Sequence, residues 1–150
     1  MKQILMYVAT CTAFLATSAL AADGMTALTS PYNAKETMDR MEAAAKAKGQ
    51  MVFARVDHAA GAAKTGKTLR PTEVLIFGNP VGGTPLMECA QSAGIDLPQK
   101  ALVWEDGAGQ VWIAYNDPAF LARRHGVPEC AAIASLQKAL AAMVADAVAK

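Results

Sequence analysis

The amino-acid sequence predicts an α+β domain of two layers, in which helices cover one face of a mostly antiparallel sheet. Two observations lead to this prediction. Some segments alternate apolar and polar residues, as strands do, and others repeat apolar residues at helical spacing. In chain order these segments are strand, helix, strand, strand, helix, hairpin, helix and helix, and such an order is typical of a two-layer α+β domain.

Residues 1–21 are predicted to be a cleavable signal peptide. Lys2 supplies the only charge of this segment, residues 4–20 are apolar or small, and the segment ends in Ala19-Leu20-Ala21-Ala22. A membrane anchor is the alternative, but the run is short for a spanning helix and has no basic flank. Cleavage would leave residues 22–150 as a single domain, periplasmic or secreted, with no stable membrane insertion.

The charge of the mature domain excludes two classes of partner. Without Lys2, the 14 basic residues become 13, which balance 13 acidic residues, and no block of like charge occurs. Such a surface gives little attraction to phosphate backbones or anionic lipids. We therefore expect neither nucleic-acid binding nor membrane-surface binding.

The first elements follow from alternation and capping. Residues 25–30 form a short strand, and a helix over 34–48 is capped by Asn33 and stopped by Gly49. Residues 51–57 alternate and predict the second strand.

The middle of the chain contains a central strand between two less regular segments. Residues 58–66 are small and interrupted by glycine, so they predict a loop or a short helix. Residues 73–77 are an apolar, β-favouring run and predict the central strand. The next helix is predicted to begin with Thr84 as its cap and Pro85 as its first residue.

The clearest hairpin joins residues 101–105 to 110–115 through Asp106-Gly107-Ala108-Gly109. If Glu105 pairs with Gln110, one face carries Leu102, Trp104, Val111, Ile113 and Tyr115. A further helix is predicted over 119–125.

Pro128 is predicted to start the last helix. Apolar residues recur in it at helical spacing: Leu136, Leu140, Met143 and Val144.

Two cysteines remain after cleavage of the signal, Cys89 and Cys130. An even count in an oxidising compartment favours a disulfide between them. The alternative is two separately buried thiols, which pack as small apolar groups.

Three blocks of sequence resemble the bacterial family known as domain of unknown function 302. The blocks are Ser30-Pro31-Tyr32; residues 52–62 continuing through 69–80 to 83–87; and Leu97-Pro98 with residues 102–106, 111–112 and 115–118. The resemblance covers about residues 26–127 and implies a compact α+β fold that assembles as a homodimer. It implies no assigned reaction and supplies no catalytic residues.

A small-ligand site is predicted where two strand ends approach a glycine-rich turn. Its candidate residues are Asp57, His58, Glu73, Asn79, Gly82 and Gly83. Exposed backbone N–H groups at the turn could hold an anion, although the motif lacks the Lys-Ser/Thr pair of a phosphate-binding loop. The alternative is a tight structural turn.

His58 is the candidate for more specific chemistry. It could serve as a haem ligand, with Met87 as the second axial ligand, and any haem would be held non-covalently because no Cys-x-x-Cys-His motif occurs. It could also act as a general acid or base with Glu73 or Glu105. The alternative is a histidine that orders the following loop. A zinc site is not expected, because the mature chain offers too few ligands.

Three functions remain open on the sequence. The first is a binding module for a small molecule or an envelope protein, without catalysis. The second is a haem or redox-cofactor protein that uses His58, and the third is a small acid–base enzyme.

Overall fold

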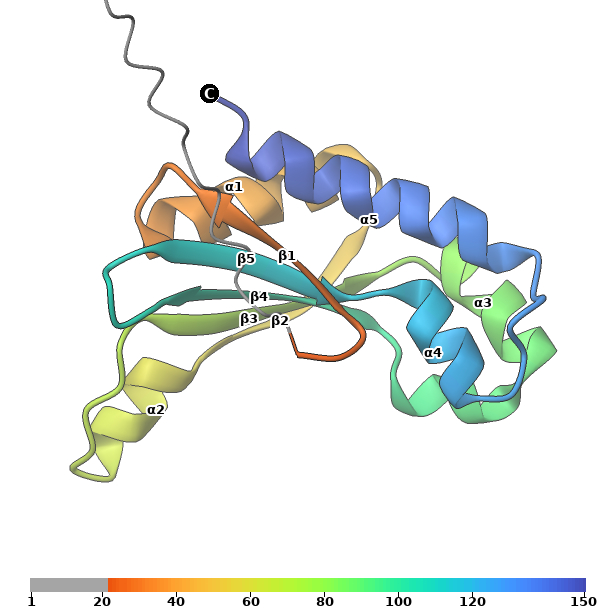
Figure 1. Ribbon diagram of the computed structural model, residues 1–150, viewed down its shortest axis with the longest axis horizontal. Coiled ribbons are helices and arrows are strands. Elements are labelled where there is room, and N and C mark those ends of the chain that lie inside the picture. The colour runs from red at the N-terminus through yellow and green to blue at the C-terminus, as the bar shows by residue number, and fades with distance from the viewer. Residues whose placement is uncertain (1–21) are drawn as a thin grey trace, which may run out of the picture.

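The computed structural model describes residues 22–150, so the predicted signal peptide lies outside the described residues (Figure 1). Five strands and five α-helices, with one short 3₁₀ helix, confirm the predicted α+β class. The elements are β1 (Met25–Ser30), α1 (Ala34–Ala47), β2 (Met51–Asp57), α2 (His58–Lys64), β3 (Thr72–Gly78), α3 (Pro80–Cys89), η1 (Gln91–Ile95), β4 (Gln99–Glu105), β5 (Val111–Asn116), α4 (Pro118–Arg124) and α5 (Ala132–Val148).

The five strands form one antiparallel sheet in the order β1-β5-β4-β3-β2. Neighbouring strands from β2 to β5 are consecutive in the chain, whereas β1 joins the far edge beside β5. The connection through α1 therefore crosses the whole sheet, from one edge strand to the other. This crossing places α1 over the sheet, where its buried residues Met38 and Met41 join the core.

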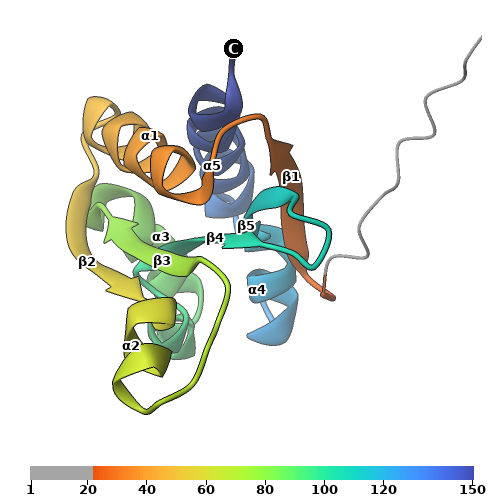
Figure 2. The ribbon, with the colours of Figure 1, turned by 90° about the vertical axis from the view of Figure 1, so that its left-hand side faces the viewer.

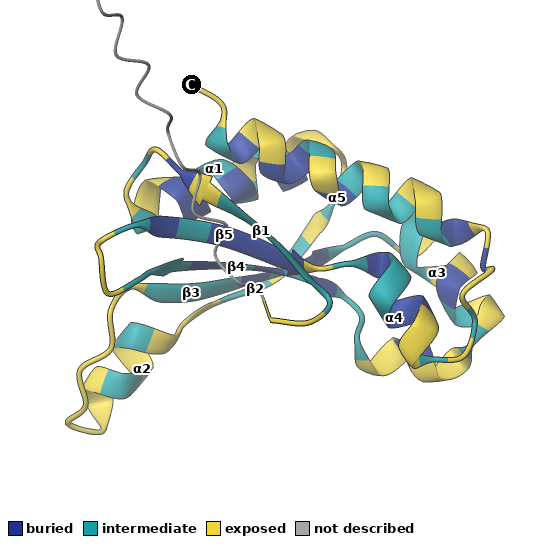
Figure 3. Cartoon of the chain, in the orientation of Figure 1, coloured by how far each residue is buried: buried dark blue, intermediate teal, exposed yellow. Residues whose placement is uncertain are grey.

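Helices α1 and α5 form the second layer (Figure 2). An apolar core lies between these helices and the sheet, formed by alternate buried residues of β3, β4 and β5 and by buried residues of the helices. Figure 3 shows buried segments on both layers. The strand residues of this core are Leu75, Phe77, Ala101, Val103, Val111, Ile113 and Tyr115, and its α5 residues include Leu140, Met143 and Val144. Across residues 22–150, no helix combines the length and apolarity needed to cross a membrane.

The hairpin between β4 and β5 differs by one residue from the predicted register. Glu105 pairs with Val111 rather than with Gln110, so Val111 and Ile113 share a face with Val103. The Asp106 carboxylate explains the shift, because it accepts hydrogen bonds from the backbone N–H groups of Ala108 (2.9 Å) and Gln110 (3.0 Å). Gln110 is thereby held in the turn and does not pair in the strand.

Helix α3 begins five residues earlier than predicted. Asn79 is its cap and accepts a hydrogen bond from the Val81 N–H at 2.9 Å, so Pro80 and not Pro85 is the first helical residue. The predicted glycine-rich turn is therefore part of a helix. The last helix also differs, because α5 begins at Ala132 rather than at Pro128.

Candidate functional site

A pocket of about 590 Å³ lies where β3 ends and β4 begins, between the sheet and the helices α3 and α5. One wall comes from the sheet, where Phe77 and Gln99 are neighbouring partners on β3 and β4. The opposite wall comes from α3 and α5. The lining consists of Gln50, Phe53, Phe77, Gly78, Asn79, Pro80, Val81, Gly82, Gly83, Thr84, Met87, Gly94, Leu97, Pro98, Gln99, Ser135, Leu136, Ala139, Leu140 and Met143.

Small residues keep this pocket open. A Cβ atom at Gly83 would lie 3.5 Å from Leu97 Cδ1, and one at Gly82 would lie 3.7 Å from Leu136 Cδ2. Side chains longer than a methyl group at these helical positions would therefore enter the space between the walls. On α5, the small side chain of Ala139 likewise leaves space in the pocket, and this residue is half-buried against the core.

Within residues 22–150, no ionisable side chain lines the pocket. Among its polar residues, Asn79 already binds the main chain, because it caps α3 and its Nδ2 donates to the Gly49 carbonyl at 3.1 Å. The N–H groups of Gly82 and Gly83 both donate to the Asn79 carbonyl at 3.0 Å. These amides are committed within the helix, so the wall offers apolar contact and not an anion cradle.

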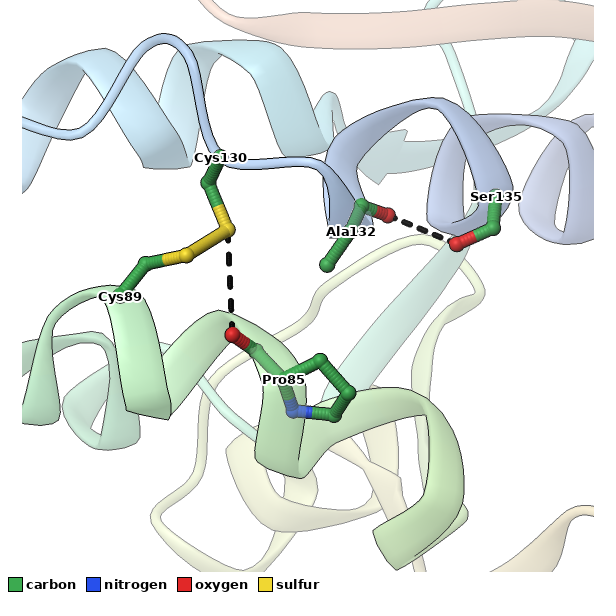
Figure 4. The surroundings of a disulfide bond; sticks show 5 residues. All are labelled: Pro85, Cys89, Cys130, Ala132 and Ser135. Atoms are coloured by element: carbon green, nitrogen blue, oxygen red, sulfur yellow. Dashed lines mark hydrogen bonds between the residues drawn. A yellow bond between two sulfur atoms is a disulfide. The ribbon is translucent and has the colours of Figure 1, made fainter.

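A disulfide joins Cys89 at the end of α3 to Cys130 just before α5 (Figure 4). Their Cα atoms lie 6.1 Å apart across a sequence separation of 41 residues. Cys130 Sγ also lies 3.8 Å from the Pro85 carbonyl oxygen. The disulfide therefore connects α3 to the start of α5, and these two helices form the pocket wall opposite the sheet.

The sequence-predicted site does not assemble as one cluster. Asp57 pairs with Glu73 at one end of the β2–β3 ladder, whereas Gly78, just before Asn79, pairs with Met51 at the other end. In an antiparallel pair the end of one strand lies beside the start of the other, so the end of β2 and the end of β3 lie at opposite ends of the sheet. Asn79, Gly82 and Gly83, which follow β3, line the pocket, whereas Asp57, which ends β2, lies away from it. The Asp57 carboxylate instead caps α2 through the Ala60 N–H at 2.8 Å.

His58 is the exposed first residue of α2, a helix that projects from the sheet away from α3 (Figure 1). Met87 lies in α3, in the pocket wall, so the structure does not bring the proposed haem-ligand pair together. Within residues 22–150, His58 has no side-chain hydrogen bond to Glu73 or Glu105. That range also contains no cluster of three or more potential metal ligands.

Glu73 belongs to an ion-pair cluster around Arg55. The Arg55 guanidinium donates to both Glu73 oxygens, to Asp39 Oδ1 at 2.6 Å and to Glu42 Oε2 at 3.2 Å. The hydrogen bond with Glu73 is the main cause that raises the pKa of Arg55. Hydrogen bonds from lysines and from Arg55 lower the pKa values of Asp39 and Glu42. The cluster fastens α1 to β2 and β3, which is a structural role.

Replacing Arg55 by leucine is expected to lower the free energy of unfolding by about 1–2 kcal/mol at neutral pH. Because the folded-state pKa values of Asp39 and Glu42 are lowered, their stabilisation is present at neutral pH and is lost as pH falls through those values. The difference from wild type should therefore shrink toward about pH 3. Urea unfolding at the two pH values measures it.

Arg40→Leu is the matched control for this experiment. Arg40 donates to the backbone carbonyl oxygens of Ala147 (2.7 Å) and Ala149 (2.6 Å), which do not titrate. Its stability deficit should be the same at both pH values. A deficit for Arg55→Leu that does not change with pH would contradict the electrostatic role of the cluster.

The predicted carboxylate Glu105 lies at the hairpin, beside Asp106. Glu105 ends β4, and its N–H donates to the Pro71 carbonyl. Asp106 accepts from Trp112 Nε1 at 2.7 Å, and this bond is the main cause that lowers the pKa of Asp106. Asp106 therefore organises the turn.

One polar cluster was not foreseen from the sequence. His125 Nε2 lies 2.6 Å from Asp96 Oδ2, His125 Nδ1 lies 2.9 Å from Ser92 Oγ, and Arg124 binds the other oxygen of Asp96 at 2.9 Å. None of these four residues lines the 590 Å³ pocket. Because Asp96 accepts from two residues at the end of α4, the cluster joins η1 to α4.

Comparison with known proteins gives three findings. The family model described as "Domain of unknown function DUF302" matches residues 11–143. Similar curated proteins include the fluoride-specific ion channels FluC 1 of Brucella suis and FluC 1 of Brucella abortus, each 51% identical over 104 residues, or 69% of this chain. The chain spans only 41% and 38% of the lengths of those two proteins.

A solved structure shares the fold. The uncharacterized conserved protein DUF302 from Bacillus stearothermophilus superposes with a TM-score of 0.76 at 22% identity. The superposition covers 84% of this chain and 99% of that one. The two-layer architecture therefore extends beyond close sequence relatives.

Proposed function

The chain belongs to the family of the domain of unknown function DUF302, which has no assigned reaction, and we propose that it binds small apolar molecules in the pocket between the sheet, α3 and α5. The observation that carries this proposal is the 590 Å³ pocket, whose wall is formed mainly by apolar side chains and glycines. Ligand pockets in proteins have volumes of about 300–1,000 Å³ and are mainly apolar, with a few polar groups.

The contents of the wall support binding rather than catalysis. The described part of the chain places no ionisable group in the wall, so it offers a ligand there no general acid, general base or charged nucleophile. His58, the residue on which the haem and acid–base alternatives depended, lies outside the pocket. The names of the Brucella proteins describe longer chains, of which the match covers only 41% and 38%, so the pocket and not those names carries the proposal.

A fluorescence titration tests this function. N-phenylnaphthylamine is an uncharged apolar probe whose emission rises when it leaves water. We expect saturable binding to the folded protein, lost when the protein is unfolded in urea. Emission that rises linearly with probe, without saturation, would contradict the proposal.

We also propose that the protein is exported and forms a homodimer. The signal-like segment and the Cys89–Cys130 disulfide support export, since disulfides persist in oxidising compartments. The family resemblance and the sheet face opposite α1 and α5 support a dimer. On that face Trp104 and Trp112 stack with ring centroids 6.2 Å apart and are only half-buried.

A native mass spectrum of the protein produced and exported by cells tests both statements together. We expect a dimer of chains that begin at Ala22, each about two hydrogen masses lighter than the reduced chain. An uncleaved chain would contradict export, and a monomer at micromolar concentration would contradict the dimer.

A further inference from the structure

Among the pocket residues within the described range 22–150, Gln99 alone has a polar side chain that is both buried and unpaired. It is the first residue of β4 and faces the helices, as Ala101 and Val103 do. The residue is only 7% exposed, and its Nε2 has no hydrogen-bond partner within residues 22–150. Buried polar groups in native proteins are nearly always hydrogen-bonded, so an unpaired amide in a pocket wall indicates a missing partner.

We propose that the Gln99 amide donates a hydrogen bond to an uncharged oxygen, such as a ketone, aldehyde or ester carbonyl, of an otherwise apolar ligand. This inference rests on the proposed function of the pocket and adds the chemical class of its ligand. The amide N–H is a donor, so the ligand atom that meets it must be an acceptor. A pure hydrocarbon would leave the amide unpaired.

The rest of the wall indicates that this acceptor is uncharged. None of the lysines, arginines and histidines of residues 22–150 lines the pocket, so a bound carboxylate would lose its water without gaining a counterion from them. An alkylammonium ion would likewise find no carboxylate in the wall. A carbonyl oxygen is satisfied by a single amide donor and brings no charge.

The test compares three ligands that each carry two phenyl rings on one carbon, and each is measured by its displacement of N-phenylnaphthylamine. Benzophenone has a carbonyl group, 1,1-diphenylethene has a methylene group in place of that oxygen, and diphenylacetate carries a negative charge. For the wild-type protein, we expect benzophenone to bind about tenfold more tightly than diphenylethene, as one buried hydrogen bond allows. Diphenylacetate should bind more weakly than benzophenone.

Gln99→Leu removes the donor and should bring benzophenone and diphenylethene to within about twofold of each other. Gln50→Leu is the matched control, because Gln50 also lines the pocket but is not among its buried, unpaired groups. It should keep the tenfold preference. The wild-type comparison needs no variant, so the test stands even if Gln99→Leu fails to fold.

The two proposals fail in different ways. If the wild-type protein binds the probe but binds benzophenone and 1,1-diphenylethene with equal affinity, the proposed role of Gln99 is wrong. The proposed function of the pocket is then unaffected. If diphenylacetate binds most tightly of the three, the proposal that the ligand is uncharged is also wrong. A wild-type protein that does not bind N-phenylnaphthylamine overturns both proposals.

Discussion

Replacing Cys89 and Cys130 together by alanine is expected to lower the free energy of unfolding by roughly 4 kcal/mol. The disulfide closes a loop with a sequence separation of 41 residues, and the chain-entropy model assigns a loop of this length about that stabilisation. For a domain of this size the loss corresponds to a fall in melting temperature of roughly 10–20 °C. Differential scanning calorimetry measures the shift.

The effect should also reach the pocket. The bond fixes the end of α3 to the start of α5, and both helices supply wall residues such as Met87 and Leu136. We therefore expect weaker binding of N-phenylnaphthylamine to the double variant at temperatures where it is still folded. Dithiothreitol should reproduce the melting shift in the wild-type protein and add nothing in the variant. Equal melting temperatures for the oxidised and reduced wild type would contradict this result.

Ala139→Phe is expected to reduce the affinity for N-phenylnaphthylamine at least about tenfold, which corresponds to about 1.4 kcal/mol of binding free energy. Ala139 lies on α5 in the pocket wall, half-buried against the core. A phenyl ring added there occupies the space that a ligand would use. The fluorescence titration of the proposed function measures the loss.

Ala141→Phe is the matched control for the filled pocket. Ala141 is an exposed residue of the same helix, so the same change adds a ring to solvent and leaves the pocket open. It should bind the probe as the wild type does. Circular dichroism reports whether both variants keep the helical content of the wild type. A folded Ala139→Phe protein with unchanged affinity would place the ligand elsewhere.

The sequence was sufficient to predict most of the sheet because local periodicity determines strands. Residues 51–57 match β2, and residues 25–30 match β1. The predicted disulfide is present as well. Prediction failed where one side chain changed the local pairing. Asn79 caps α3 and draws two glycines into the helix, and Asp106 holds Gln110 in the turn.

The pocket itself could not be predicted from the sequence. Its wall combines segments of β2, β3, α3, η1, β4 and α5, and only tertiary packing brings these segments together. The order of the strands also determined the outcome for the predicted site, because antiparallel pairing sends Asp57 and Asn79 to opposite ends of the sheet. One local signal did exist. Gln99 occupies a core-facing position two residues before Ala101, where an apolar residue is the ordinary choice.

Photolabelling with benzophenone tests the location of the ligand site most directly. Irradiated benzophenone inserts into nearby C–H bonds, and peptide mass spectrometry identifies the labelled segments. We expect the labels in the pocket wall, on peptides from residues 77–87 and 135–143, and we expect Ala139→Phe to remove them. Labels confined to α2 around His58, or to the face of Trp104 and Trp112, would contradict a ligand site between the sheet, α3 and α5.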